Sequence, residues 1–211
     1  MNSENEIAKN LLQIKAIKLN PQNPFTWASG IKSPIYCDNR VTLSHPTVRQ
    51  AIKEGLLNLL NKFENIDMVA GVATAGIAHG ALLADAAGLP FCYVRSAPKG
   101  HGRQNQIEGE IKPNSRIIVV EDLISTGGSS LEAVEILREN GHEVIAVLAI
   151  FDYQFEKAVE NFRKFDCKYF TLCNYSALTN EAVSSNYISE GDFEVLKAWN
   201  NDPVKWYDNN F

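Results

Sequence analysis

The stretch IIVVEDLISTGGSS, from Ile117 to Ser130, determines how the rest of the chain is interpreted. Its apolar beginning indicates a buried strand, and two adjacent acids, Glu121 and Asp122, follow directly. A short turn rich in hydroxyl groups and glycine comes next, before a helical pattern begins. We therefore predict that the strand ends at the acids, so that the acids and the turn lie at the carboxyl edge of a sheet.

Apolar runs and helical patterns alternate on both sides of this stretch. Strands are expected at residues 67–72, 91–94, 116–121, 143–151 and 167–172, and helices at 75–88, 128–141 and 154–165. Further helices are expected over roughly 4–18 and 46–63, and from Ser189, capped with Asp192. The alternation predicts an α/β fold with a central parallel sheet flanked by helices. We expect a single domain of residues 1–211, with a core of roughly 64–172 and a small lobe of roughly 1–45 plus 173–211.

Composition excludes several classes of protein. The 211 residues are 45% hydrophobic and 21% charged, with a net charge of −5, which argues against a general binder of nucleic acid or membrane surfaces. The four cysteines form no C-x-x-C pair, and no apolar run reaches the roughly 18 residues that a membrane span needs. We expect a protein of the reducing cytoplasm with no nucleic-acid and no membrane partner.

The turn after Asp122 has the chemistry of a phosphate site. Backbone amides from Ser125 to Ser129 at a helix N-terminus can hold an anion, and Thr126 and Ser129 add hydroxyl donors. The two carboxylates would repel a phosphate, so they are expected to face sugar hydroxyls or a hydrated Mg²⁺. The alternative is an ordinary helix start with spare acids. The first interpretation predicts a site for ribose 5-phosphate.

This segment resembles the phosphoribosyl-diphosphate (PRPP) binding motif of type I phosphoribosyltransferases. That motif has an apolar strand, two acids, two apolar or small residues, and a Ser/Thr-Gly turn. Competing nucleotide motifs fail: Gly71 to Gly76 has the glycine spacing of a P-loop but lacks the Lys-Ser/Thr that must follow. The resemblance implies the type I phosphoribosyltransferase fold.

A basic segment narrows the resemblance. YVRSAPKGHGRQNQIEG places Arg95, Lys99, His101 and Arg103 on an expected polar loop from Arg95 to about Lys112, after a buried strand. The run Arg-x-x-x-Lys-x-His-Gly is similar to the mobile catalytic loop of the orotate phosphoribosyltransferase family. The earlier FTWASGIKSPIYCDNR is similar to that family's N-terminal signature. The alternative for the basic segment is a solvated charged loop.

The resemblance implies a reaction and its residues. Orotate would displace diphosphate from PRPP, with Mg²⁺, to give orotidine 5′-monophosphate in pyrimidine biosynthesis. Catalytic roles would fall to Lys99, His101 and Asp122, without a protein nucleophile and without a dedicated metal site of the protein. Ala73 to Gly76 would form a diphosphate-binding turn. The residues implied to bind PRPP are Arg95, Lys99, His101, Glu121, Asp122, Leu123, Ile124, Ser125, Thr126, Gly127, Gly128 and Ser129. The family also implies a homodimer in which the Arg95–Gly109 loop reaches the partner's active site.

The orotate end of the site departs from the family pattern. Some members carry cations where this chain has Ala28, Ser96 and Tyr153. Ser125 is expected to reach orotate, and Tyr36 to stack on its ring. The substrate's carboxylate needs another cation, and both Lys32 and Arg40 are candidates.

Two other functions share parts of the pattern. A purine-base phosphoribosyltransferase would have the PRPP motif but would lack the FTWASGIKSP signature. A PRPP-sensing regulator would need a DNA-binding module and a basic face, and the net negative charge argues against it. His79 is expected to pack in its helix, and Trp199 and Trp206 to anchor the small lobe.

Overall fold

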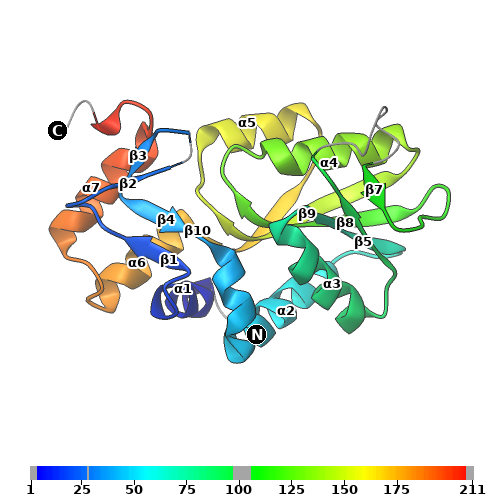
Figure 1. Ribbon diagram of the computed structural model, residues 1–211, viewed down its shortest axis with the longest axis horizontal. Helices are drawn as coiled ribbons and strands as arrows, with labels where there is room; N and C mark the ends of the chain where they lie inside the picture. Colours follow the sequence, from blue (N-terminus) through cyan, green and yellow to red (C-terminus); the bar gives the residue numbers. More distant parts are fainter. Residues whose placement is uncertain (1–3, 28, 97–105, 208–211) are drawn as a thin grey trace.

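A six-stranded sheet forms the centre of the molecule (Figure 1). The computed structural model describes residues 4–27, 29–96 and 106–207. In order across the sheet, the strands are β10 (Tyr169–Asn174), β9 (Glu143–Asp152), β8 (Arg116–Ile124), β5 (Met68–Val72), β6 (Phe91–Val94) and β7 (Ile107–Glu108). All neighbours pair in parallel except β6 and β7, which are antiparallel. The predicted parallel sheet is confirmed, with one antiparallel edge strand added.

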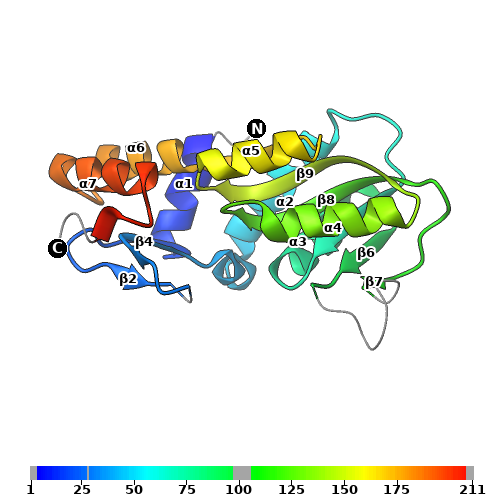
Figure 2. The same ribbon diagram turned by 90° about the horizontal axis from the view of Figure 1, so that it is seen from above.

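Helices cover both faces of this sheet (Figure 2). The strand β8 shows why, because its residues alternate between two hydrophobic clusters. Ile118 and Val120 belong to the cluster that includes residues of the helices α1 (Glu4–Gln13), α2 (Pro46–Leu60) and α3 (Ala75–Ala87). Ile117 and Val119 belong to the cluster of α4 (Gly128–Glu139) and α5 (Glu156–Lys164). A strand buried on both faces is apolar throughout, as the sequence showed.

Segments from the two ends of the chain form a lobe beside the sheet (Figure 1). It contains two antiparallel pairs, β1 (Ile17–Leu19) with β4 (Ile35–Cys37) and β2 (Phe25–Thr26) with β3 (Lys32–Ser33), and the helices α6 (Tyr175–Ser184) and α7 (Glu190–Asn201). The predicted capping box of Ser189 and Asp192 opens α7. Trp199 and Trp206 are buried in the same hydrophobic cluster as one face of the sheet, so the lobe and the sheet share a core.

Besides the unpredicted strands β1 to β4 and shifts of up to two residues at the ends of elements, four features differ from the sequence predictions. The first helix ends at Gln13 instead of Lys18, because Lys15 takes a left-handed conformation (φ 58°) and Ile17 then pairs with Cys37. The second helix ends at Leu60 instead of about Phe63. The expected polar loop from Arg95 to about Lys112 contains β7.

The fourth difference concerns β8, which does not end at the acids. The strand runs on to Ile124 because β9 continues beside it, pairing Leu123 with Phe151 and Ile124 with Asp152. Glu121 and Asp122 therefore lie within a strand instead of directly after one.

Two further features bear on the protein's class. Within the described parts of the chain, every helix is too short or too polar to cross a membrane. All four cysteines are free thiols.

Candidate functional site

Segments with functional groups gather at the carboxyl edge of the sheet, as predicted. The turn after β5, the end of β6 and the start of α4 meet there, since Ala73, Arg95 and Ser129 line one small cavity of about 10 Å³. Arg95 is also paired with Glu108 of β7, with Nη1 3.4 Å from Oε1. Lys99 and His101, which the sequence assigns to the diphosphate, lie outside the described residues.

The start of α4 presents backbone amides at this edge. The helix begins at Gly128, and the first amide to bond back within it is that of Leu131, which donates to the carbonyl of Gly127 at 2.9 Å. The amides of Gly128, Ser129 and Ser130 precede that bond, and the positive end of the helix dipole lies among them. This arrangement can hold a phosphate.

The turn that leads into α4 is fixed by close packing. Gly127 has a left-handed backbone (φ 78°), and a Cβ added to it would lie 2.6 Å from Cε2 of Phe162 in α5. Asn161 of the same helix donates from Nδ2 to the carbonyl of Thr126 at 2.9 Å. The helix α5 therefore sets the path of the turn, and only glycine fits at position 127.

Glu121 points toward α4. Its side chain accepts hydrogen bonds from the hydroxyls of Ser129 (2.9 Å) and Ser130 (3.3 Å) and from the backbone amide of Asp122 (3.0 Å). Burial, and next the charge of Asp122, raise the pKa of Glu121 above its ordinary value. These oxygens of Glu121 have partners inside the protein, and the predicted contact of Glu121 with sugar hydroxyls or a hydrated Mg²⁺ stays a prediction.

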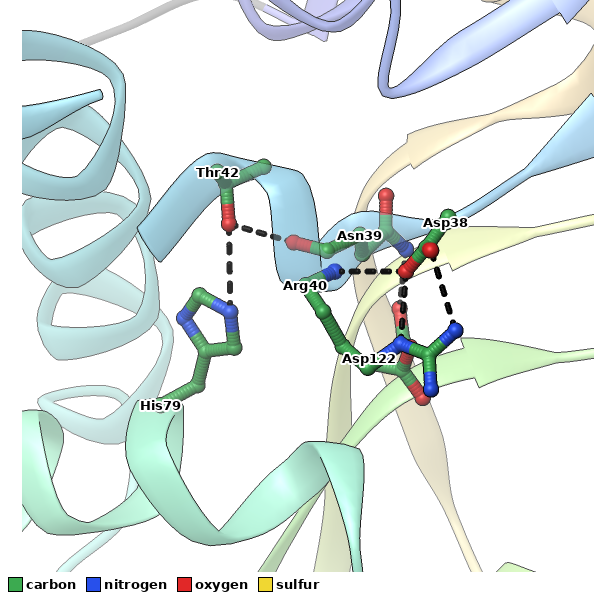
Figure 3. Close-up of polar contacts among 6 residues, drawn as sticks. All are labelled: Asp38, Asn39, Arg40, Thr42, His79 and Asp122. Atoms are coloured by element: carbon green, nitrogen blue, oxygen red, sulfur yellow. Dashed lines mark hydrogen bonds and ion pairs between the residues drawn. The ribbon is translucent and has the colours of Figure 1, made fainter. Parts of the chain in front are cut away.

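The main chain of Asp122 is held by side chains. The last β5–β8 pair joins Gly71 to Val120, so β8 has no β5 partner at Asp122. The amide of Asp122 donates to Glu121, and its carbonyl accepts from Nδ2 of Asn39 at 2.7 Å (Figure 3). Burial raises the pKa of its carboxyl above the ordinary value, and the nearby Arg40 guanidinium opposes part of this rise.

The segment that supplies Asn39 is itself anchored at both ends (Figure 3). Asp38 holds Arg40 through two bonds, at 2.7 and 2.9 Å. Thr42 donates to the carbonyl of Asn39 at 2.5 Å, and its hydroxyl lies 3.2 Å from Nε2 of His79. Because Thr42 uses its proton on Asn39, His79 is the donor in the second contact. Burial lowers the pKa of His79 to about 4, so this predicted packing residue is neutral at neutral pH.

An aromatic pocket lies next to the turn from Ser125 to Ser129 (the phosphate turn). It has a volume of about 230 Å³ and is lined by Trp27, Tyr36, Cys37, Leu123, Ser125 and Tyr153. A larger cavity of about 520 Å³ shares Trp27 and Ser125 with it and extends toward α5 and the end of α7. Flat apolar walls beside the phosphate turn suit a planar ring. Two of the residues predicted for orotate, Tyr36 and Ser125, therefore line one pocket.

Lys32, the third residue predicted for orotate, is directed elsewhere. Its Nζ donates to the hydroxyl of Thr26 at 2.8 Å and lies 5.6 Å from the centre of the Tyr207 ring. Its role in orotate binding stays a prediction.

Several residues of the site were missed by sequence reasoning. Trp27 and Cys37 lie inside the signature segment, and Tyr153 was noted only for its departure from the family pattern. Alternation along β4 gave no signal, because both Tyr36 and Cys37 line the pocket. Asn39 was also missed, and its place beside Asp38 and Arg40 in YCDNR was the one available signal.

Comparisons with known proteins agree with this arrangement. Residues 42–182 match the family model described as phosphoribosyl transferase domain. The orotate phosphoribosyltransferase of Porphyromonas gingivalis is 52% identical, over 95% of this chain and 96% of the relative. That of Bacillus pumilus is 54% identical, over 94% of each. The crystal structure of orotate phosphoribosyltransferase from Aeropyrum pernix is 28% identical and superposes with a TM-score of 0.75, over 87% of this chain and 99% of the other.

The family model covers most of the sheet and its helices, and the full-length relatives also cover the lobe that closes the aromatic pocket. The chain belongs to the orotate phosphoribosyltransferase family.

Proposed function

We propose that this protein transfers the phosphoribosyl group of PRPP to orotate, giving orotidine 5′-monophosphate and diphosphate in pyrimidine biosynthesis. The observation that carries the proposal is the meeting at Ser125 of two sites, the amide-rich start of α4 and the aromatic pocket. One accepts a phosphate and the other accepts a planar ring, so a nucleotide can bridge them.

This geometry supports the following arrangement of the substrates. The 5′-phosphate of the sugar binds the turn from Ser125 to Ser129, and Asp122 meets the sugar hydroxyls. The diphosphate lies toward Arg95 and the turn from Ala73 to Gly76, where Lys99 and His101 of the basic segment contact it. Orotate lies in the aromatic pocket, against Tyr36 and Ser125.

Catalysis follows from charge and alignment. As diphosphate leaves C1, positive charge builds on the sugar ring and negative charge on the leaving group. Asp122 stabilises the sugar, while Arg95, Lys99 and His101 stabilise the diphosphate. The orotate ring nitrogen attacks directly, so the protein supplies no nucleophile, and holding both substrates in line accounts for much of the rate.

Mg²⁺ fits this site as an ion that binds together with the substrate. Among the described residues no group of three or more His, Cys, Asp or Glu side chains could hold a metal ion. Mg²⁺ is commonly bound through substrate phosphates and one or two carboxylates, and Asp122 offers one. When bound, the ion neutralises charge on the diphosphate.

The proposal includes a cytoplasmic homodimer. The family resemblance implies that the segment from Arg95 to Gly109 reaches the active site of the partner subunit. Such an arrangement makes each site dependent on two chains.

Turnover with purified full-length protein tests the function. Initial rates are measured with PRPP and Mg²⁺ and with orotate, hypoxanthine or adenine as the base, following nucleotide formation by chromatography. Among the three bases, only orotate is expected to give a nucleotide, which is orotidine 5′-monophosphate. Turnover of a purine base without turnover of orotate would transfer the assignment to a purine-base phosphoribosyltransferase.

Mixing of two inactive variants tests the shared site. Lys99→Ala removes a cation of the loop, and Asp122→Asn removes the carboxylate that we assign to the sugar hydroxyls. A heterodimer of the two has one site with both groups intact, so mixing is expected to restore about a quarter of the wild-type activity. If activity stays absent although subunits exchange, the loop acts within its own chain.

A further inference from the structure

The aromatic pocket lacks a cation among its described lining residues, which are Trp27, Tyr36, Cys37, Leu123, Ser125 and Tyr153. A carboxylate that leaves water needs charged or polar partners in its place. Orotate carries a carboxylate on its ring, so a cation must reach it from the edge of the pocket.

Lys32 does not approach this edge. It lies on β3 of the small lobe, where it bonds to Thr26 and lies over the ring of Tyr207. A role with orotate would require it to leave both partners.

Arg40 is better placed. It follows β4, the strand whose Tyr36 and Cys37 line the pocket, by three residues. Although 63% of its side chain is exposed, Asp38 holds the guanidinium at two atoms, Nε at 2.7 Å and Nη2 at 2.9 Å. The guanidinium has five N–H donors, and among the described residues only Asp38 takes any of them. A planar edge therefore remains for a second carboxylate.

The groups near Arg40 belong both to the aromatic pocket and to the acid that we assign to the sugar. After Asp38, Tyr36 and Asp122 also favour the charged form of Arg40, and Arg40 in turn opposes part of the rise that burial causes in the pKa of Asp122. Asn39, its neighbour in the chain, bonds to the carbonyl of Asp122. Arg40 thus lies within electrostatic reach of both Tyr36, in the wall of the base pocket, and the acid that we assign to the sugar.

We propose that Arg40, held in place by Asp38, binds the carboxylate of orotate and so determines specificity for the carboxylated pyrimidine. The proposal rests on the function proposed above. Asp38 preorganises the guanidinium, which reduces the ordering that binding would otherwise require.

Two nucleotides that differ only in this carboxylate provide the test. Dissociation constants of orotidine 5′-monophosphate and uridine 5′-monophosphate are measured by calorimetry for the wild type, Arg40→Gln and the matched variant Lys32→Gln. Arg40→Gln is expected to weaken orotidine 5′-monophosphate by about 10- to 100-fold, the range for a hydrogen bond to a charged group. The affinity for uridine 5′-monophosphate is expected to change by less than about twofold, as it lacks the interaction.

Other outcomes separate the alternatives. Equal weakening of both nucleotides by Arg40→Gln would place Arg40 at the sugar or phosphate and overturn the proposal. Loss of selectivity in Lys32→Gln, with selectivity kept in Arg40→Gln, would assign the carboxylate to Lys32. Asp38→Asn, which releases Arg40 without removing it, is expected to lose part of the selectivity. If the wild type binds neither nucleotide, the proposed function itself fails.

Discussion

A single amide of Asn39 holds the main chain of Asp122 where the β5 ladder has ended. Asn39→Ala leaves that carbonyl without its donor, which costs about 1–3 kcal/mol of unfolding free energy. Because Asp122 is the acid assigned to the sugar, we expect the KM for PRPP to rise about tenfold, with the KM for orotate nearly unchanged. Initial-rate kinetics and urea unfolding measure the two effects.

A second asparagine provides a control that distinguishes an effect on the position of Asp122 from an effect on the stability of the protein. Asn140 donates from Nδ2 to the carbonyl of Ile136 at 2.8 Å, a bond of the same kind at the far end of α4. Asn140→Ala is expected to lower stability by less than Asn39→Ala, because Asn140 is exposed and the carbonyl of Ile136 also accepts the Asn140 backbone amide at 3.2 Å, and to leave both KM values alone. If both variants change the kinetics alike, Asn39 contributes only to the fold.

Sequence reasoning reached the acids and the glycine turn but not Asn39. The acids belong to one contiguous pattern, whereas the bond from Asn39 to Asp122 spans 83 positions. The continuation of β8 past Glu121 and Asp122 was also missed, since it depends on β9 continuing beside β8. That pairing is long-range, and tertiary contacts commonly override a local turn signal.

At the scale of elements, the turn into α4 depends on its contact with α5. Gly127→Ala adds a Cβ that would lie 2.6 Å from Phe162 and places alanine in a left-handed conformation. We expect a loss of more than about 1 kcal/mol in unfolding free energy and a weaker affinity for PRPP, because the amides of the turn move. Urea unfolding and calorimetric titration with PRPP measure both.

Gly141 is the control for backbone strain. It also has a left-handed conformation (φ 83°), but a Cβ there meets nothing within 4 Å. Gly141→Ala is expected to show the strain without the clash, and to bind PRPP as the wild type does. A Gly127→Ala variant no worse than Gly141→Ala would mean that α5 does not shape the turn.

Helices and strands were predicted well where the hydrophobic periodicity and the capping residues agreed. Their ends were predicted less well. The parallel strands and the helices α3, α4 and α5 followed from apolar runs and helical spacing, with glycine stops after α3 and α4. Short strands were missed: β7 has two residues, and β2 and β3 have two each. Such strands have too few residues to show an alternating pattern of burial, so only their pairing with another strand identifies them.

At the scale of the molecule, one hydrophobic cluster runs from the sheet into the small lobe. Trp199 of α7 is fully buried at the junction. Its ring lies 5.6 Å from Trp27, 5.9 Å from Tyr153 and 5.6 Å from Phe155, measured between ring centres. The sequence indicated a buried anchor there but not the partners, which come from the N-terminal part of the chain and from the segment that follows β9.

Trp199→Ala tests whether the lobe and the sheet unfold together. Removing this side chain is expected to cost about 3–5 kcal/mol of unfolding free energy, the range for large aromatic residues in cores. Activity is expected to fall as well, because Trp27 and Tyr153 line the base pocket. Val159→Ala, at a position 52% exposed on α5, is expected to change stability by less than about 0.5 kcal/mol.

Coincident transitions would follow from the shared core. In urea, the wild type is expected to unfold in one step whether it is followed by tryptophan fluorescence, which reports the lobe and its junction, or by far-ultraviolet circular dichroism, which reports the whole chain. Two separated transitions in the wild type would contradict this, since they would require the lobe to detach while the sheet stays folded. The aromatic pocket would then be lost before the phosphate turn, because Trp27, Tyr36 and Cys37 come from the lobe and Ser125 comes from the sheet.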